Sequence, residues 1–427
     1  MSTLDLAQDT TQSDLSITPE PAVEVVASYR DVFAVAEFRT VFAADLCSLA
    51  GDQIAAVAIA VLLYQRSGSA LLAALGYATA YVPWLLGGPV LAAWAERFAG
   101  RTVMVACDLG RAGLIGLAAI PGLPLAVVGL LVLAAALLAP PFDSARSALL
   151  PQILTGDRYA VAASVRDAVH QGAQLAGFAL GGLLVVAVST SGALALDAVS
   201  FAASSVVLRF GLRLRPSLVE HQASSLWHET GAGLALVRAD PALYRPLLLG
   251  VLGAGYAIVP EAIAPAYAGS LGAGPRAIGL IMAAVAGGSV IGGLALGRLV
   301  KPSTRIRWTP SLALAGALPL LAVALHPGLI VSLLLFAITG LASSYQIVVN
   351  AMFAQRVPAA FRSRAFGIAI SAIYGGQALA IVLAGAAAQF LPATTVIAGA
   401  GLLGVLGVLA LWTRLGATPG WSSPRRA

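Results

Sequence analysis

Several carboxylates lie inside apolar stretches of the sequence, where a charge is costly to bury. Asp45 and Asp52 are seven residues apart, so a helix places both on one face. Glu261 lies in another apolar stretch, between Pro260 and Pro265. A charge at the centre of a bilayer costs about 2.5–3.5 kcal/mol, so these side chains should face a protein interior. There they can bind and release protons or hold a cation. A structural carboxylate, hydrogen-bonded to a neighbouring helix, is the alternative for each.

Other charged residues are predicted to be structural. Asp108 and Arg111 are three residues apart, which favours an ion pair on one helix face. Asp197 lies near the predicted outer end of its apolar stretch, where it is expected to anchor the end of a helix. Arg166 is expected to pair with Asp143 or Asp167.

His170 shares one helix face with Arg166 and Gln174. Histidine is the side chain that titrates near neutral pH, so His170 is a further candidate for proton coupling. A histidine that only packs against its neighbours is the alternative.

Aromatic and amide side chains recur at helical spacing and could line a cavity for an amphipathic organic molecule. Ordinary helix packing is the alternative for each group. The candidates are Tyr77, Tyr81 and Trp84 in one stretch, Gln346 and Asn350 in a second, and Tyr374 and Gln377 in a third.

The sequence carries no enzyme or cofactor motif. It has no HExxH, no phosphate-binding loop and no dinucleotide-binding fingerprint, so we expect neither an enzyme nor a cofactor. Two cysteines and four scattered histidines give no metal-ligand spacing. No basic cluster is interleaved with aromatic residues, which argues against a nucleic-acid partner.

The composition requires lipid as the main solvent. Hydrophobic residues make up 59% of the 427 residues and charged residues 10%, whereas soluble domains carry roughly 25% charged residues. A membrane span needs about 20 apolar residues. The sequence therefore predicts an all-α integral membrane protein with twelve spans, at 41–64, 70–94, 102–120, 125–149, 161–188, 193–210, 244–267, 278–299, 308–325, 329–353, 366–390 and 394–412.

Basic residues gather in alternate gaps between these stretches. The other gaps hold only Arg66 and Arg276. Because Lys and Arg resist translocation, the basic gaps are predicted to be cytoplasmic, with both termini on the same side.

Internal similarity divides the chain into two six-helix bundles. Arg66 follows the first span as Arg276 follows the seventh. The predicted organisation is a disordered tail (1–35), a bundle (36–213), a cytoplasmic linker with an amphipathic helix (214–241), a second bundle (242–413) and a short tail (414–427).

The loop Gly88-Pro-Val-Leu-Ala-Ala-Trp-Ala-Glu-Arg-Phe-Ala-Gly-Arg101 resembles the signature of the major facilitator superfamily between spans two and three. Glu96 stands where the family has Asp, and Ala92 where it has Gly. The resemblance covers nearly the whole chain. It implies two pseudo-symmetric bundles, alternating access and a cytoplasmic gate formed by Glu96, Arg97 and Arg101.

Four further motifs resemble the macrolide-efflux and siderophore-exporter branch of that superfamily. They are Ser48-Leu-Ala-Gly-Asp52, the segment Pro141-Phe-Asp-Ser-Ala-Arg146, Leu196-Asp-Ala-Val-Ser-Phe201, and the run from Gln355 to Gly367. The branch implies a bacterial inner-membrane exporter of small organic molecules, driven by protons and acting as a monomer among membrane lipids.

The chain also departs from the superfamily. Phe178 replaces the proline of the antiporter motif on span five, and span four lacks a mid-span arginine because Arg146 lies at its cytoplasmic end. Two rival functions remain open. One is a lipid or lysophospholipid flippase on the same fold, which needs a basic headgroup site. The other is a membrane receptor or assembly factor that transports nothing.

Overall fold

The chain is built from helices. The computed structural model describes residues 28–86, 97–154, 157–215, 235, 237–357 and 362–415, and these contain no β-strand. In chain order the helices are α1 (Tyr29–Phe33), α2 (Ala36–Ser67), α3 (Ala70–Ala78), α4 (Val82–Leu86), α6 (Gly100–Ala118), α7 (Leu125–Ala136), α8 (Ala139–Ile153), α9 (Asp157–Gly211), α11 (Pro241–Ala262), α12 (Ala264–Ser270), α13 (Pro275–Leu299), α14 (Pro302–Ala322), the 3₁₀ helix η1 (Val323–Leu325), α15 (Leu329–Ser343), α16 (Tyr345–Arg356), α17 (Arg362–Ala387) and α18 (Ala393–Leu415).

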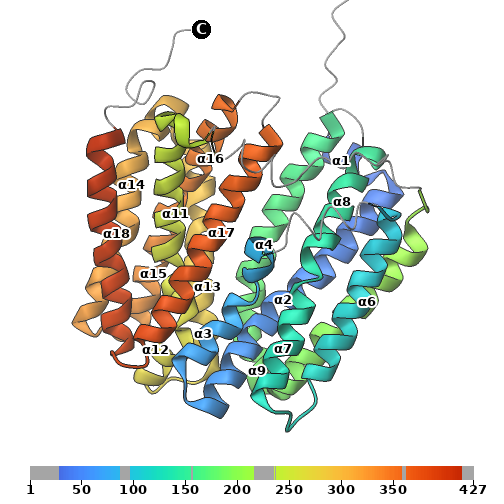
Figure 1. Ribbon diagram of the computed structural model, residues 1–427, viewed down its shortest axis with the longest axis horizontal. Coiled ribbons are helices and arrows are strands. Elements are labelled where there is room, and N and C mark those ends of the chain that lie inside the picture. Colours follow the sequence, from blue (N-terminus) through green and yellow to red (C-terminus); the bar gives the residue numbers. More distant parts are fainter. Residues whose placement is uncertain are drawn as a thin grey trace, which may run out of the picture.

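The helices form two groups that lie side by side (Figure 1). Helices α1–α9 make one half and α11–α18 the other. The first and last described residues lie at the same end of the molecule, which we call the terminal end. The opposite end, which carries the turn at Gly68, is the distal end.

Local sequence explains where the helices turn. Ser69 caps α3 by accepting a hydrogen bond from the Leu72 amide, and the preceding Gly68 has a φ of 64°, which favours glycine. Asp240 caps α11 in the same way, directly before Pro241. Within α9, Ser189 leaves the helical region (φ 68°, ψ 171°), and its side chain accepts from the Gly192 amide. Helix α9 therefore folds back on itself at the distal end.

Most of these helices suit a membrane. In the described part of the chain, nine helical segments are long and apolar enough to cross a bilayer. One of them, over Val161–Gly211, contains the fold-back at Ser189. Helix α6 is not among the nine and carries Arg101, Asp108 and Arg111. The all-helical membrane architecture is confirmed, and the number of twelve crossings stays a prediction.

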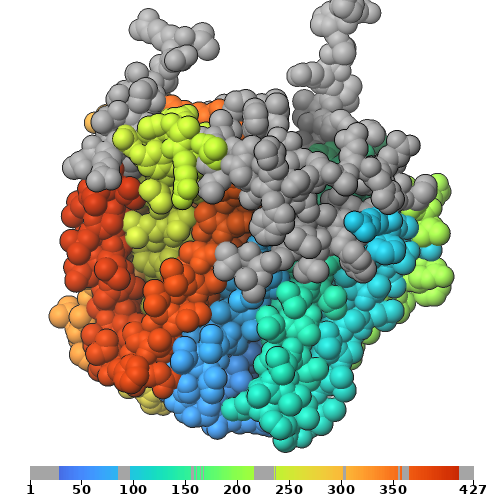
Figure 2. Space-filling view, in the orientation of Figure 1, coloured from blue at the N-terminus to red at the C-terminus, as the bar shows by residue number. Residues whose placement is uncertain are grey.

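The two halves meet backbone to backbone near the distal end. A methyl group added at Gly279 of α13 would lie 2.5 Å from the Phe178 carbonyl oxygen and 2.9 Å from the Gly182 Cα. One added at Gly385 of α17 would lie 3.2 Å from the Leu71 Cα of α3. Glycines thus allow the helices to pack closely here. Figure 2 shows α17 and α3 in direct contact on this face. We call this contact the distal seam.

Regular structure begins nearer to the N-terminus than predicted. Ser28 and Asp31 form a capping box on α1, and Val32 is fully buried. Residues 29–33 therefore do not belong to a disordered tail. Glu37 at the start of α2 accepts from both terminal nitrogens of Arg215, at 2.9 and 2.6 Å. Most of the predicted linker with its amphipathic helix (214–241) lies outside the described residues, and the remaining domain limits stay predictions.

Candidate functional site

A polar cavity lies between the two halves, on the terminal side of the distal seam. Both halves contribute to its wall: Tyr81 follows α3, and Gln171 and Gln174 belong to α9. The remaining lining residues come from the other half, and they are Ala254, Ala257, Ile258, Glu261, Val285, Ala286, Ser289, Ser343, Gln346 and Gln377. A pocket of apolar walls with a few convergent polar groups is the usual form of a small-molecule site.

Glu261 is the only charged side chain that lines this cavity in the described part of the chain. It is 5% exposed, and its Oε2 accepts a 2.6 Å hydrogen bond from the Tyr77 hydroxyl of the other half. Pro260 precedes it, and the helical geometry is broken two residues later at Ile263 (φ −113°, ψ 19°). The sequence prediction that Glu261 lies at a bent helix in the interior therefore agrees with the structure.

Four aromatic rings continue from this hydrogen bond towards the terminal end. Tyr77 packs edge-on against Tyr81, with the ring centres 5.8 Å apart. Tyr374 of α17 contacts Tyr81 at 5.8 Å and stacks on Trp84 at 5.7 Å. We call these residues the aromatic ladder. It joins the halves because Tyr374 comes from α17 and the other three from the segment α3–α4.

The amides predicted for the cavity are only partly brought together. Gln346 and Gln377 line it, but Asn350 is exposed and is not among the lining residues. Gln171 and Gln174 contribute amides that sequence reasoning did not assign to the cavity. Gln171 and Gln174 are three positions apart on α9, the helix that faces α13, so both amides lie on one helix face. That spacing was the sequence signal that could have identified them.

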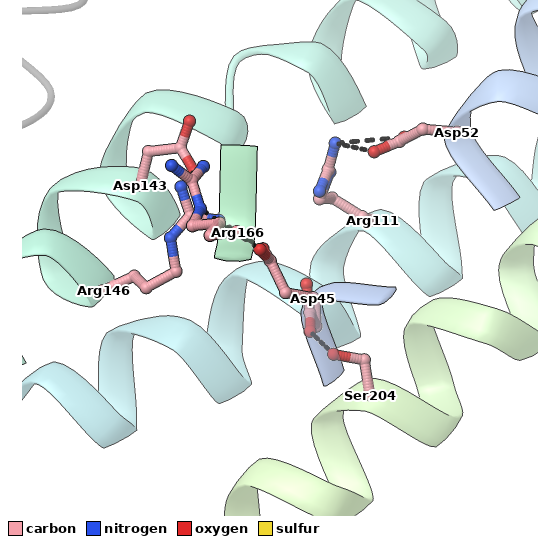
Figure 3. Close-up of polar contacts among 8 residues, drawn as sticks. Asp45, Asp52, Arg111, Asp143, Arg146, Arg166 and Ser204 are labelled. Atoms are coloured by element: carbon pink, nitrogen blue, oxygen red, sulfur yellow. Dashed lines mark hydrogen bonds and ion pairs between the residues drawn. The ribbon is translucent and has the colours of Figure 1, made fainter. Parts of the chain in front are cut away.

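A second polar cluster lies inside the first half alone. Asp45 accepts hydrogen bonds from Arg146 and from Arg166, the latter at 3.3 Å (Figure 3). Arg146 also contacts Asp143 at 2.5 Å. Arg166 contacts Asp45 of α2, which the sequence did not predict. Of its expected partners Asp143 and Asp167, the side chain of Asp167 lies outside the described part of the structure. Arg146 is 5% exposed, so this pairing is buried.

Asp52 lies further along α2 and pairs with Arg111 of α6. The Arg111 Nη2 lies 3.2 and 3.3 Å from the two Asp52 oxygens (Figure 3). The guanidinium also covers the Phe201 ring, 4.2 Å from its centre. The expected pair between Asp108 and Arg111 is therefore wrong: Arg111 contacts a residue 59 positions away, and Asp108 accepts a 2.5 Å hydrogen bond from Ser204. About a third of the Asp52 side chain stays accessible.

The location of Asp197 also differs from the one predicted from the sequence. It is 1% exposed and packs against α2 in the interior. A methyl group added at Gly51 would lie 2.3 Å from the Asp197 Oδ1 and 2.3 Å from the Ser200 Oγ. Gly51 is glycine here because Asp197 and Ser200 approach its backbone. Asp197 therefore faces the charged cluster and does not merely anchor a helix end.

These contacts join three of the sequence motifs. The segment Ser48–Asp52 meets Leu196–Phe201 through Gly51 and through Arg111, which contacts Asp52 and Phe201. The segment Pro141–Arg146 meets the same helix α2 at Asp45. The acids and arginines of this region form what we call the buried charge cluster: Asp45, Asp52, Asp108, Asp143, Asp197, Arg111, Arg146 and Arg166.

Four predicted site residues remain predictions. His170 is exposed, with no hydrogen bond to a described residue. Arg97 is exposed, and Glu96 lies outside the described residues. Arg101 donates a 3.0 Å hydrogen bond to the Leu212 carbonyl at the end of α9. The proposed gate of Glu96, Arg97 and Arg101 is therefore untested.

The described residues contain no group of three or more His, Cys, Asp or Glu placed to hold a metal ion. Cys47 and Cys107 are both free thiols.

Comparison with known proteins gives one family over most of the chain. The model described as Major Facilitator Superfamily matches residues 41–327. The Multidrug efflux pump Tap of Mycobacterium tuberculosis (strain ATCC 25618 / H37Rv) is 26% identical over 365 residues, 80% of this chain and 84% of that protein. Tap of Mycobacterium bovis (strain BCG / Pasteur 1173P2) matches equally.

Solved structures share the fold at low identity. A bacterial homologue of the iron transporter ferroportin, in an inward-facing state, superposes with a TM-score of 0.68 at 15% identity, covering 93% of this chain and 100% of that chain. A mutant of the nucleoside transporter NupG gives 0.67 at 13% identity, covering 88% and 99%.

Proposed function

Because this chain belongs to the Major Facilitator Superfamily, we propose that it is a secondary transporter that exports small organic molecules by proton antiport and alternating access. Its twelve spans would lie in a bacterial inner membrane, with both termini in the cytoplasm. The protein would act as a monomer among membrane lipids, without a cofactor and without chemical change to the substrate.

The observation that carries this proposal is Glu261 in the cavity between the halves. A buried carboxylate among amides and aromatic rings suits a molecule with a protonated amine and an apolar body. Gln174, Gln346 and Gln377 can donate or accept hydrogen bonds from the substrate's neutral polar groups. The matched multidrug efflux pumps support a substrate of this class.

The distal seam supports alternating access. It brings α9 against α13 and α3 against α17 at backbone distance, while the polar cavity lies on its terminal side. With the termini in the cytoplasm, this conformation is closed to the outside, and opening the seam would expose the cavity there. The hydrogen bond from Tyr77 to Glu261 and the aromatic ladder would separate in that movement.

The flippase alternative is less well supported. It requires a buried cation for a lipid phosphate, and Arg111 was the candidate. Arg111 is already bonded to Asp52 and covers Phe201. Arg146 and Arg166 are likewise bonded to Asp45. An anionic headgroup would have to displace a carboxylate at each of them.

Uptake into inverted membrane vesicles tests the proposal. Vesicles with the wild-type chain should accumulate a lipophilic organic amine when a proton gradient is imposed and lose it when the gradient collapses. Glu261→Gln should lose transport of cationic substrates while retaining neutral ones. Glu37→Gln is the matched control, because it makes the same substitution at a residue that lies at the terminal end, away from the cavity. No gradient-dependent accumulation of any amphipathic compound would contradict the proposal, and equal transport by Glu261→Gln would remove Glu261 from the site.

A further inference from the structure

The buried charge cluster contains more carboxylates than arginines. In the described part of the first half, Arg146 contacts both Asp45 and Asp143, and Arg166 contacts Asp45. Arg111 contacts Asp52. Among the residues that the structure describes, no cation lies within ion-pair distance of Asp108 or Asp197. Both are at most 1% exposed. An isolated carboxylate charge is too costly to bury without a partner, so such a group takes up a proton instead.

Asp108 and Asp197 differ in their surroundings. One oxygen of Asp108 accepts the short hydrogen bond from Ser204 of another helix segment. Among the described residues, the side-chain hydrogen bond to the Asp197 carboxyl group comes from Ser200 of its own helix, at 3.3 Å. The charged groups near Asp197 on the packed helices are Asp52 on α2 and Arg111 on α6.

We propose that Asp197 binds the coupling proton of the transport cycle, and that it shares Arg111 with Asp52. The proposal rests on the proposed proton-driven export. Two carboxylates and one guanidinium carry a net charge of −1, and one proton on a carboxyl oxygen brings this to zero. In the conformation described here, Arg111 contacts Asp52, and Asp197 therefore holds the proton.

The geometry provides for exchange between the two acids. Gly51 and Asp52 are adjacent in α2, and Asp197 lies against Gly51. The partly accessible side chain of Asp52 gives the proton a route to water. When Asp197 releases its proton, its carboxylate gains a negative charge, and the guanidinium of Arg111 can then move towards it. Asp52, which loses that contact, takes up a proton in turn. No other reactant is needed, and the number of charges is unchanged.

Infrared spectroscopy of the purified full-length chain tests the protonation state without any transport. A neutral carboxyl group has a carbonyl stretch that a carboxylate lacks and that shifts in heavy water. The wild type should show such bands at neutral pH, and Asp197→Asn should lose one of them. Asp108→Asn is the matched variant, because it makes the same change at the other unpaired acid of the cluster. An unchanged carboxyl spectrum in Asp197→Asn would overturn the proposal.

Reconstituted vesicles separate coupling from transport. Exchange of labelled for unlabelled organic amine across the membrane needs no net proton movement, whereas substrate-driven proton flux into vesicles loaded with a pH dye does. Asp197→Asn should retain exchange and lose the proton flux. Asp108→Asn should retain both.

The outcomes distinguish the two proposals. Wild-type protein without exchange would contradict the proposed transport function. Wild-type exchange without proton flux would contradict proton coupling, and therefore the role of Asp197. Proton flux in Asp197→Asn, or its loss in Asp108→Asn alone, would contradict the assignment to Asp197.

If Asp197→Asn fails to fold, Gly51→Ala displaces the same carboxyl group and should lower proton flux more than exchange. Equal loss of both would overturn the proposal.

Discussion

At the scale of single residues, the structure pairs several buried charges with partners on other helices. Asp45 and Asp52 share a face of α2, as their spacing predicts, and both meet arginines. Spacing along one helix could not identify those arginines. From the sequence we predicted an ion pair between Arg111 and Asp108, because the two are three residues apart. In the structure Arg111 instead pairs with Asp52 of α2, which is 59 positions away. Only the packing of α2, α6 and α9 decides such pairs.

At a pH at which Glu261 is ionised, the hydrogen bond that Tyr77 donates to Glu261 should be stronger than a neutral one. Tyr77→Phe removes a donor to a carboxylate, for which about 1.5–3 kcal/mol is expected. Tyr267→Phe is the matched control, since its hydroxyl bonds to the Ser332 hydroxyl at 2.7 Å within one half. We expect the larger fall in melting temperature for Tyr77→Phe, measured on detergent-purified protein. Equal falls would show that the Tyr77 bond carries no charge-related stabilisation.

Arg111 should stabilise the first half mainly by compensating Asp52. Arg111→Gln leaves the Asp52 carboxylate without its cation. Breaking a fully buried pair costs about 3–5 kcal/mol, and the partial accessibility of the Asp52 side chain should lower this cost. Adding Asp52→Asn removes the uncompensated charge, so the double variant should be more stable than Arg111→Gln alone. Chemical unfolding in detergent measures this. A double variant less stable than Arg111→Gln would contradict the pairing.

At the scale of helices, close contact between α9 and α13 depends on glycine. The sequence could not show which glycines of the two helices face each other. Gly182 meets Gly279, whereas Gly288 and Gly292 of the same helix α13 meet α15 inside the second half. The distal seam and the internal packing of one half thus use different faces of one helix.

Gly279→Ala should weaken the distal seam. The added methyl group would contact backbone atoms at 2.5–2.9 Å, so the helices must separate. Gly297→Ala on the same helix meets nothing within 4 Å and should be neutral or slightly stabilising, because alanine favours a helix over glycine by about 1 kcal/mol. Cross-linking between cysteines at Ser69 and Gln389, whose side chains lie 2.7 Å apart, should decrease in Gly279→Ala only. Unchanged cross-linking would show that the seam tolerates the methyl group.

At the scale of the whole molecule, composition and charge distribution were sufficient to predict an all-helical membrane protein, and the superfamily was suggested by the resemblance of the loop Gly88–Arg101. Hydropathy identified helices because lipid cannot satisfy exposed backbone groups. The cavity was harder to predict, because its lining residues come from α9, α11, α13, α15, α16, α17 and the residue Tyr81 after α3. Of the residues predicted for the cavity, Tyr81, Gln346 and Gln377 line it, and so does Glu261, which was predicted as a proton or cation site. Tyr77, Trp84, Tyr374 and Asn350 are not among its lining residues. Helical spacing finds a face, and only tertiary packing shows what that face contacts.

The two ends of the molecule should be accessible from opposite sides of the membrane. Lys301 precedes α14 at the terminal end, and Phe390 follows α17 at the distal end, where it is 87% exposed. Cysteines at these positions, in a chain lacking Cys47 and Cys107, should react with a membrane-impermeant thiol reagent from different sides. In intact cells only the Phe390 position should be labelled. Labelling of both would overturn the predicted orientation.

The charges of α6 also constrain how the chain enters the membrane during synthesis. Helix α6 is the segment that carries Arg101, Asp108 and Arg111, and it is not apolar enough to count as a membrane span by itself. Its partners are Asp52, which is synthesised before it, and Ser204, which is synthesised roughly a hundred residues after it. The insertion machinery therefore has to retain this segment until the end of α9 emerges from the ribosome. The first half should accordingly assemble as one unit, and a chain truncated before Ser204 would expose α6 to membrane quality-control proteases.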